Sequence, residues 1–168
     1  MSALLKKFIN RQDSILILLA AASTLALTGA YISQYVFGYQ PCILCLYQRW
    51  PFFIIIVIYI ISLLLKKQIK TLTIIALLSV IANIIIAGYH VGVEQKIFQG
   101  LSGCSSAVDL NKIDNLAELT EAISLISAVR CDEPQFYFLG ITMAGWNLIY
   151  CLILLKIGFA LKRIRAKL

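Results

Sequence analysis

Residues 71–93, TLTIIALLSVIANIIIAGYHVGV, contain no charged side chain. An α-helix needs about 20 predominantly apolar residues to cross the hydrocarbon core of a bilayer, so this stretch is long enough to span a membrane. Three further long stretches are free of charge, at residues 14–48, 50–65 and 134–155. The pattern therefore predicts a chain that crosses the membrane four times.

The four predicted spans fall at about residues 14–33, 45–65, 71–89 and 141–161, so the second also includes Arg49 and the fourth Lys156. The composition agrees, because 61% of the 168 residues are hydrophobic and 14% are charged, whereas about a quarter of a soluble domain is charged. We therefore predict an all-α integral membrane protein. Its fold is a four-transmembrane-helix bundle that forms a single membrane domain over residues 1–168.

The first span could instead be a cleaved signal peptide, since basic residues precede it and residues 28–30, TGA, weakly resemble a cleavage site. Its apolar run is longer than the usual run of about 7–15 residues, and three more spans follow it. We therefore expect the first span to be retained.

The net charge of +7 is concentrated in three basic clusters beside the predicted spans. These are Lys6, Lys7 and Arg11; Lys66, Lys67 and Lys70; and Lys162, Arg163, Arg165 and Lys167. Cytoplasmic loops carry an excess of Lys and Arg, so the clusters indicate topology and not nucleic-acid binding. They predict that both termini are cytoplasmic and that a long loop, about residues 90–140, is periplasmic. This loop holds seven acidic and three basic residues.

Four of the five cysteines fall on the predicted periplasmic side, as two pairs. Cys42 and Cys45 form a C-x-x-C motif at the outer end of the second span, and Cys104 and Cys131 lie in the long loop. The loop pair could simply be a staple, because closing such a loop stabilises by about 3 kcal/mol in the chain-entropy model. However, glycines and serines surround Cys104 in residues 99–106, and disulfide exchange requires such an accessible sulfur.

The C-x-x-C motif could also bind a metal. Structural zinc sites usually have four ligands, and this chain has a single C-x-x-C and a single histidine. A metal site would have to recruit Cys104, Cys131 or His90, so we expect no metal site. The fifth cysteine, Cys151, lies among apolar residues in the fourth span, where it is expected to act as a small buried hydrophobe.

A redox role accounts for each feature around the motif. Pro41 suits a turn that leads into a helix, so Cys42 and Cys45 would lie at a helix N-terminus, where the dipole and free N–H groups favour a thiolate. Arg49 follows Cys45 by one helical turn and could stabilise a thiolate or another anion. The alternative is that Arg49 only snorkels to the membrane surface. The chain has no obvious haem or flavin signature, which favours a lipid-soluble electron acceptor such as a quinone.

The order of these features resembles the disulfide bond formation protein B (DsbB) family of bacterial inner-membrane thiol:quinone oxidoreductases. Residues 41–49, PCILCLYQR, are followed by a second cysteine pair in an outer loop and by a fourth span, so the resemblance covers nearly the whole chain. It implies that a periplasmic DsbA-like thiol oxidase with a thioredoxin fold attacks the loop disulfide. Cys104 would form the mixed disulfide, with Cys131 as its partner. The electrons would then pass to Cys42 and Cys45.

The resemblance also implies a quinone site and a location. Cys45 would be the sulfur next to a bound ubiquinone or menaquinone, and Arg49 matches the family arginine that supports quinone reduction. His90 falls where the family often has a histidine of the quinone site, although a lone histidine at a helix end is more often an interface residue or a cap. The expected location is the bacterial inner membrane, with membrane lipid around the bundle.

Two other classes of protein have similar features. Vitamin K epoxide reductase relatives also combine four core helices, two cysteine pairs and a quinone, but their C-x-x-C lies late in the bundle, whereas here it opens the second span. The non-enzymatic alternative is a membrane scaffold or metal-handling protein whose outer disulfide is purely structural.

Polar residues predict two more structural features. Residues 115–118, NLAE, resemble a capping box, and the apolar spacing after them predicts an amphipathic helix on the outer membrane surface or over the bundle. Its apolar positions are Leu116, Leu119, Ile123 and Ile126. Asn83 and Asn147 lie within spans, where we expect them to form hydrogen bonds between helices.

Overall fold

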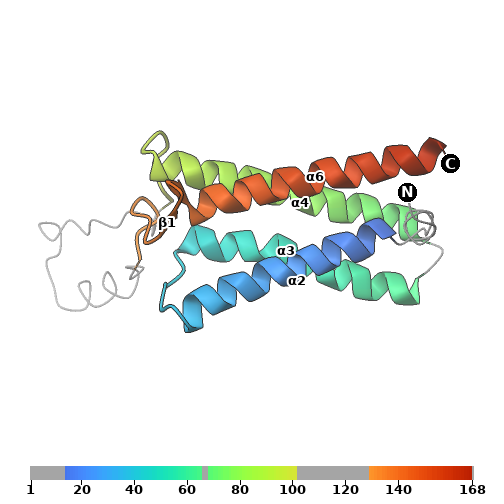
Figure 1. Cartoon of the computed structure of the whole chain (residues 1–168), viewed down its shortest axis with the longest axis horizontal. Helices are drawn as coiled ribbons and strands as arrows, with labels where there is room; N and C mark the ends of the chain where they lie inside the picture. The colour runs from blue at the N-terminus through green and yellow to red at the C-terminus, as the bar shows by residue number, and fades with distance from the viewer. Residues whose placement is uncertain (1–13, 66–67, 102–128, 168) are drawn as a thin grey trace, which may run out of the picture.

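The computed structural model describes residues 14–65, 68–101 and 129–167. In this part of the chain, four helices are long and apolar enough to cross a membrane. They are α2 (Ser14–Tyr35), α3 (Ile43–Leu64), α4 (Ile69–Glu94) and α6 (Met143–Lys167). The helices lie side by side in one bundle, with the long connection between α4 and α6 at one end (Figure 1). This arrangement confirms the predicted four-helix membrane fold.

The helix ends differ from the predicted spans by up to six residues, at the end of α6, and the difference that matters for the site is at α4. This helix continues past the predicted limit at residue 89 and ends at Glu94, so His90 lies on the helix and not in the loop. The prediction ended this span at residue 89, although the charge-free stretch itself runs to residue 93. The carboxylate of Glu94 instead turns inward and accepts a hydrogen bond from Thr142, at 2.6 Å, so its charge does not end the buried segment earlier.

The core of the bundle is built from one apolar stripe on each helix. The buried residues are Ile15, Leu16, Leu19 and Leu27 on α2; Phe52, Ile55 and Ile58 on α3; Ala76, Leu77 and Val80 on α4; and Cys151 and Leu154 on α6. Cys151 is buried among them, as its apolar neighbours predicted. Large apolar side chains also cover the outward faces of the helices, as lipid surroundings require.

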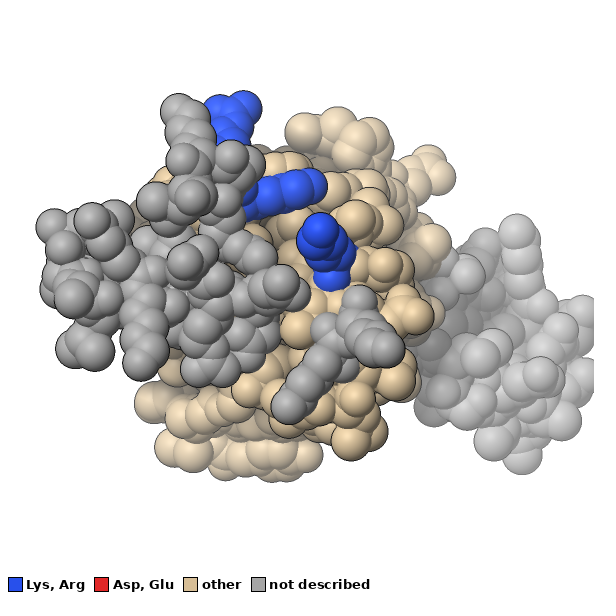
Figure 2. All heavy atoms as spheres, turned by 90° about the vertical axis from the view of Figure 1, so that its right-hand side faces the viewer, with Lys and Arg blue, Asp and Glu red and all other residues tan. Residues whose placement is uncertain are grey.

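The two ends of the bundle differ in charge. At one end α2 begins, α3 leads into α4 and α6 terminates (Figure 1). Seen from this end, the described residues present Lys and Arg but no Asp or Glu (Figure 2). Lys70, Lys162 and Arg163 belong to the two basic clusters that the described helices reach. That this end faces the cytoplasm stays a prediction.

A short β-hairpin precedes α6 at the opposite end of the bundle. Strands β1 (Tyr137–Phe138) and β2 (Ile141–Thr142) pair in antiparallel fashion, with Tyr137 opposite Thr142. Leu139 and Gly140 form the turn with φ angles of 52° and 76°, as a type I′ turn requires. The indole Nε1 of Trp146 donates to the carbonyl of Phe138 at 3.0 Å. The hairpin therefore moves the start of the fourth helix from the predicted residue 141 to Met143.

Candidate redox site

The C-x-x-C motif lies at the N-terminus of α3, as Pro41 predicted. Cys42 is the N-cap residue, with an extended backbone, and its Sγ accepts a hydrogen bond from the amide of Cys45 at 3.3 Å. The thiol of Cys42 also donates to the sulfur of Cys45, 3.0 Å away. The two sulfurs are therefore adjacent at the point where the membrane-spanning helix begins.

Cys131 reaches this motif from the segment that precedes the hairpin. It is only 2% exposed, and it packs in the same buried cluster as Cys42, Leu44 and Val93. The sulfurs of Cys42 and Cys131 and a ring nitrogen of His90 all lie within 4.8 Å of one another. The structure thus brings together one cysteine from each predicted pair.

The other half of the loop pair falls outside the described residues. Cys104 lies there, and so does the amphipathic helix predicted from residues 115–118. The pairing of Cys104 with Cys131 and the surface helix therefore stay predictions.

The environment of Cys42 favours the protonated thiol. A hydrogen bond with Cys131 lowers the pKa of Cys42, but the hydrogen bond with Cys45 and desolvation by burial raise it further, and the resulting pKa is about 12. The expectation that the helix N-terminus favours a thiolate is therefore wrong for Cys42 in this arrangement. Burial and the neighbouring sulfur outweigh the helix dipole and the amide of Cys45.

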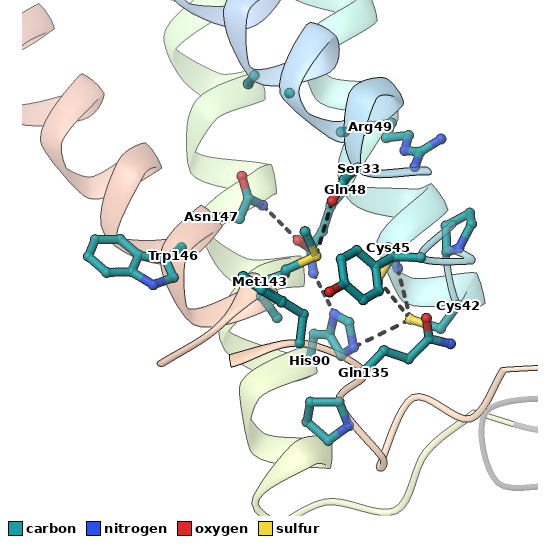
Figure 3. A pocket seen from close by; sticks show the side chains of 18 of the residues that line it. Ser33, Cys42, Cys45, Gln48, Arg49, His90, Gln135, Met143, Trp146 and Asn147 are labelled. Atoms are coloured by element: carbon teal, nitrogen blue, oxygen red, sulfur yellow. Dashed lines mark hydrogen bonds between the residues drawn. The ribbon is translucent and has the colours of Figure 1, made fainter. Parts of the chain in front are cut away.

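His90 lies between the thiols and a group of polar side chains inside the bundle (Figure 3). It is 2% exposed, so the alternative of a surface residue or helix cap is wrong. Its Nδ1 lies 2.8 Å from Nε2 of Gln48. Its Nε2 lies 3.5 Å from Sγ of Cys42 and 3.7 Å from Oε1 of Glu94. His90 thus joins the sulfur cluster to a buried carboxylate.

Three amide side chains continue this network away from the sulfurs. Nδ2 of Asn147 donates to Oε1 of Gln48 at 2.7 Å and to Oδ1 of Asn83 at 3.3 Å. Asn83 in turn donates to the backbone carbonyl of Gln48 at 3.1 Å. Asn83 and Asn147 therefore form the predicted bonds between helices. The bond from Asn83 also supports α3 in the turn before Pro51, which lacks an N–H.

Gln48 and Glu94 are two members of the site that sequence reasoning missed. Gln48 stands inside the motif stretch, and Glu94 is the acidic residue that follows the third charge-free stretch. Polar residues in or beside a span usually face the bundle interior, and that signal could have identified both. Their hydrogen-bond partners lie far away in the sequence, so these contacts could not be predicted from the positions of Gln48 and Glu94 alone.

Arg49 is held by α2. Its Nη1 donates to Oε1 of Gln34 at 2.8 Å, and the guanidinium lies 5.0 Å from the ring centroid of Tyr31, a cation–π contact. Arg49 is half-buried and lines the same cavity as Cys45. The predicted position one turn from the C-x-x-C motif is correct, and the side chain bonds within the bundle.

The charges that flank Cys131 neutralise one another. Arg130 makes a two-pronged bond to Asp132, with distances of 3.0 and 2.7 Å, and contacts Glu133 at 3.3 Å. The hydrogen bonds from Arg130 lower the pKa of Asp132. The acidic and basic neighbours of Cys131 therefore form their own surface cluster.

A cavity of about 590 Å³ opens beside the C-x-x-C motif. Its polar end is formed by Gln48, Arg49, His90, Glu94 and Asn147 together with Cys42 and Cys45. Its remaining wall is mostly apolar and comes largely from α2 and α6, including Ala26, Gly29, Ala30, Ile149 and Ile153. Small-molecule sites are typically about 300–1,000 Å³ and combine apolar walls with a few convergent polar groups. The cavity has the size and character of such a site.

The three ligand atoms of Cys42, His90 and Cys131 are also close enough to share one metal ion. Sulfurs at such distances are equally what thiol–disulfide exchange requires, because the attacking sulfur must reach its target. The expectation that the site holds no metal stays a prediction.

Comparison with known proteins adds a second line of observation. The family model described as "Disulfide bond formation protein DsbB" matches residues 12–161. An uncharacterized protein of Rickettsia prowazekii is 30% identical over 146 residues, which cover 87% of this chain and 85% of that protein. A disulfide bond formation protein B of Cupriavidus metallidurans is 31% identical over 82% of this chain and 84% of its own. One from Nitrosococcus oceani is 29% identical over 79% of each.

Proposed function

The chain belongs to the DsbB family of disulfide bond formation proteins, and we propose that it oxidises a periplasmic DsbA-like thiol oxidase and passes the electrons to a membrane quinone. The observation that carries the proposal is the contact between the two predicted cysteine pairs. Cys131 of the loop pair packs against Cys42 of the helix pair, at the polar end of a cavity that leads into the bundle. A soluble thiol donor and an acceptor dissolved in the membrane could both reach this point.

The proposed cycle begins with the loop pair. The reduced partner gives two electrons to a Cys104–Cys131 disulfide, so the partner gains a disulfide and the loop pair becomes two thiols. The deprotonated sulfur of Cys131 then attacks Cys42 in a Cys42–Cys45 disulfide. A bond forms between Cys131 and Cys42, the bond between Cys42 and Cys45 breaks, and Cys45 leaves as a thiolate.

The second exchange restores the loop. Cys104 attacks Cys131, the loop disulfide forms again, and Cys42 is released as a thiolate that takes up a proton. The loop pair has then lost two electrons and two protons, and Cys42 and Cys45 hold them as a dithiol. The high pKa of Cys42 suits this stored state, because it keeps the proton on the sulfur.

A quinone bound in the cavity would accept these two electrons and two protons and leave as a quinol. The residues present fit such a group, since the polar end offers hydrogen-bond donors for ring oxygens and the apolar wall suits an isoprenoid tail. Arg49, whose guanidinium carries five N–H groups, is the donor at the polar end, and His90 lines the same end. Ala26, Gly29 and Ala30 lie on one face of α2, and their small side chains leave room for the tail in the apolar part of the cavity.

Substitution of the helix cysteines tests the proposal. Full-length protein in lipid nanodiscs, supplied with a reduced DsbA-like protein and ubiquinone or menaquinone, should form quinol. Cys42→Ser and Cys45→Ser should abolish it, because each leaves the relay without a dithiol. Cys151→Ser is the matched control and should keep the activity, since Cys151 does not line the cavity and a hydroxyl can keep its hydrogen bond to Oδ1 of Asn147. Normal turnover in either serine variant would contradict the proposal.

A trapping experiment tests the order of the loop cysteines. Cys104→Ala should fail to form a mixed disulfide with a partner that retains only its attacking cysteine, because Cys104 is the proposed target. Cys131→Ala, with Cys104 first converted to a mixed disulfide with an aromatic thiol, should form it by releasing that thiol, and Cys104→Ala treated in the same way should not. Trapping through Cys131 alone would reverse the assignment. A scaffold or metal-handling protein would give neither the mixed disulfide nor quinol.

A further inference from the structure

The buried amides of the site can be oriented from one fixed group, the backbone carbonyl of Gln48. A carbonyl can only accept a hydrogen bond, and the side chain of Asn83 lies 3.1 Å from it. Asn83 must therefore present its NH2 group to this carbonyl. Its own oxygen, Oδ1, then faces the opposite way, toward α6.

The orientation passes from Asn83 to the next two amides. Oδ1 of Asn83 requires a donor, so the group of Asn147 that lies 3.3 Å away is its NH2. The same NH2 lies 2.7 Å from the side chain of Gln48, which must present its oxygen there. Gln48 therefore directs its own NH2 group to Nδ1 of His90, at 2.8 Å.

This last bond decides where the ring of His90 carries its proton. In a neutral imidazole one nitrogen is protonated and the other accepts, so an Nδ1 that accepts from Gln48 leaves the proton on Nε2. We propose that Asn83, Asn147 and Gln48 are positioning residues that hold His90 in the Nε2–H form. His90 then presents a hydrogen-bond donor on the side of Cys42 and is not the base that deprotonates it.

The groups around Nε2 agree with a donor role. Nε2 lies 3.5 Å from Sγ of Cys42 and 3.7 Å from Oε1 of Glu94, and both of these atoms can accept. The backbone of Cys131 also hydrogen-bonds the ring as an acceptor. Cys131 is the third titratable group beside the ring. An N–H directed at Cys42 stabilises that sulfur whenever it carries negative charge, as nucleophile or as leaving group. It also disfavours a metal ion on His90, because a metal needs an unprotonated nitrogen.

The inference deepens the proposed function, and only its catalytic consequence rests on that function. The tautomer itself can be measured without partner or quinone, because His90 is the sole histidine of the chain. Full-length protein with 15N-labelled histidine, reduced and in nanodiscs near pH 8, should show a protonated Nε2 and an unprotonated, hydrogen-bonded Nδ1. A proton on Nδ1 would overturn the proposal.

Two variants test whether the amides impose this form. Gln48→Glu places an ionised carboxylate, which only accepts, beside Nδ1, so the proton should move to Nδ1. Asn147→Leu does not touch the ring, yet it should change the Nδ1 resonance because Gln48 loses the donor that orients it. Ser23→Ala is the control. Its hydroxyl is buried without a hydrogen-bond partner among the described residues, and its removal should leave both ring nitrogens unchanged.

Unchanged ring signals in both Gln48→Glu and Asn147→Leu would show that the amides do not hold the tautomer.

The catalytic consequence is tested with two variants of His90 itself. His90→Gln keeps an N–H donor but cannot act as a base, so thiol exchange should stay within about tenfold of the wild type. His90→Leu should lose about 10- to 100-fold, the range for a lost hydrogen bond to a charged group. Equal losses in both variants would assign His90 as a base.

These outcomes are separable from those of the proposed function. A wild-type protein that reduces no quinone would contradict the proposed function and leave the tautomer measurement intact. A proton on Nδ1 in an active protein would contradict only the inference about His90.

Discussion

Arg49 illustrates how single residues are constrained inside this bundle. A charge in the membrane is costly unless it is paired or reaches the surface. Arg49 meets this requirement through Gln34 and Tyr31, both on α2, so its guanidinium stays at the cavity wall. A planar guanidinium can stack and donate in this way, whereas the compact ammonium of lysine cannot do both.

Arg49→Lys should therefore impair quinone reduction although the charge is kept. We expect the KM for quinone to rise by at least about tenfold, the effect of one lost hydrogen bond to a charged group. Reduction of the Cys42–Cys45 disulfide by the partner should change little. Steady-state rates with varied quinone, together with rapid-mixing measurements of thiol exchange, separate the two steps. If Arg49 merely snorkels to the surface, the KM will be unchanged.

The site residues divide into those that the sequence predicts and those that only the folded chain brings together. Cys42, Cys45 and Arg49 stand out because reactive or charged side chains are rare in apolar stretches. Gln48 has no such mark, since an amide is uncharged and its role depends on His90, 42 positions away, and on Asn147, 99 positions away. The helices had to be packed before these contacts could be known.

The hairpin between Cys131 and α6 is an element that the sequence pattern did not predict. Each strand has two residues, which is too short for an alternating pattern to be recognised. The turn also contains Leu139, where a type I′ turn favours Asn before Gly, so the usual sequence signal is missing. By contrast, the helices were predictable because each span has about 20 predominantly apolar residues with at most one charge.

Leu139→Asn should stabilise the protein. Leu139 has a φ of 52° and is 79% exposed, so it accepts backbone strain without gaining burial. Asn tolerates this conformation better, and we expect the free energy of unfolding to rise by about 1 kcal/mol. Thermal unfolding of the full chain in detergent measures the difference. Leu139→Ala is the control, because it removes the apolar side chain but keeps the strain, and an equal gain from Ala would attribute the effect to lost exposure.

At the scale of the whole molecule, the bundle has a basic end and a redox end. The basic clusters and charge-free stretches predicted this polarity without any structure. They could not predict which helices enclose the cavity, because several arrangements of four helices satisfy the same charges. The apolar wall from α2 and α6 emerges only from the packing.

Gly29 tests whether this wall holds an isoprenoid tail. A Cβ atom at Gly29 would meet nothing within 4 Å, so Gly29→Ala should leave the KM for quinone nearly unchanged. Gly29→Leu would project into the cavity and should raise the KM for a long-tailed quinone by about tenfold, the usual scale of overpacking. A quinone without a tail should be affected less. Equal KM values for all three proteins would place the tail elsewhere.

The N-cap of α3 is a cysteine of the proposed redox pair, so the stability of the first helical turn depends on the chemical state of that sulfur. In most helices an oxygen atom accepts the first free amide protons, and its bonding never changes. Here the acceptor is Sγ of Cys42. In the proposed cycle this sulfur gains negative charge or enters a covalent bond. A charged sulfur accepts the Cys45 amide more strongly than a sulfur in a disulfide does. If the proposed cycle holds, the first turn of α3 is expected to tighten or loosen with each exchange, and hydrogen exchange at the Cys45 amide should follow the oxidation state of the motif.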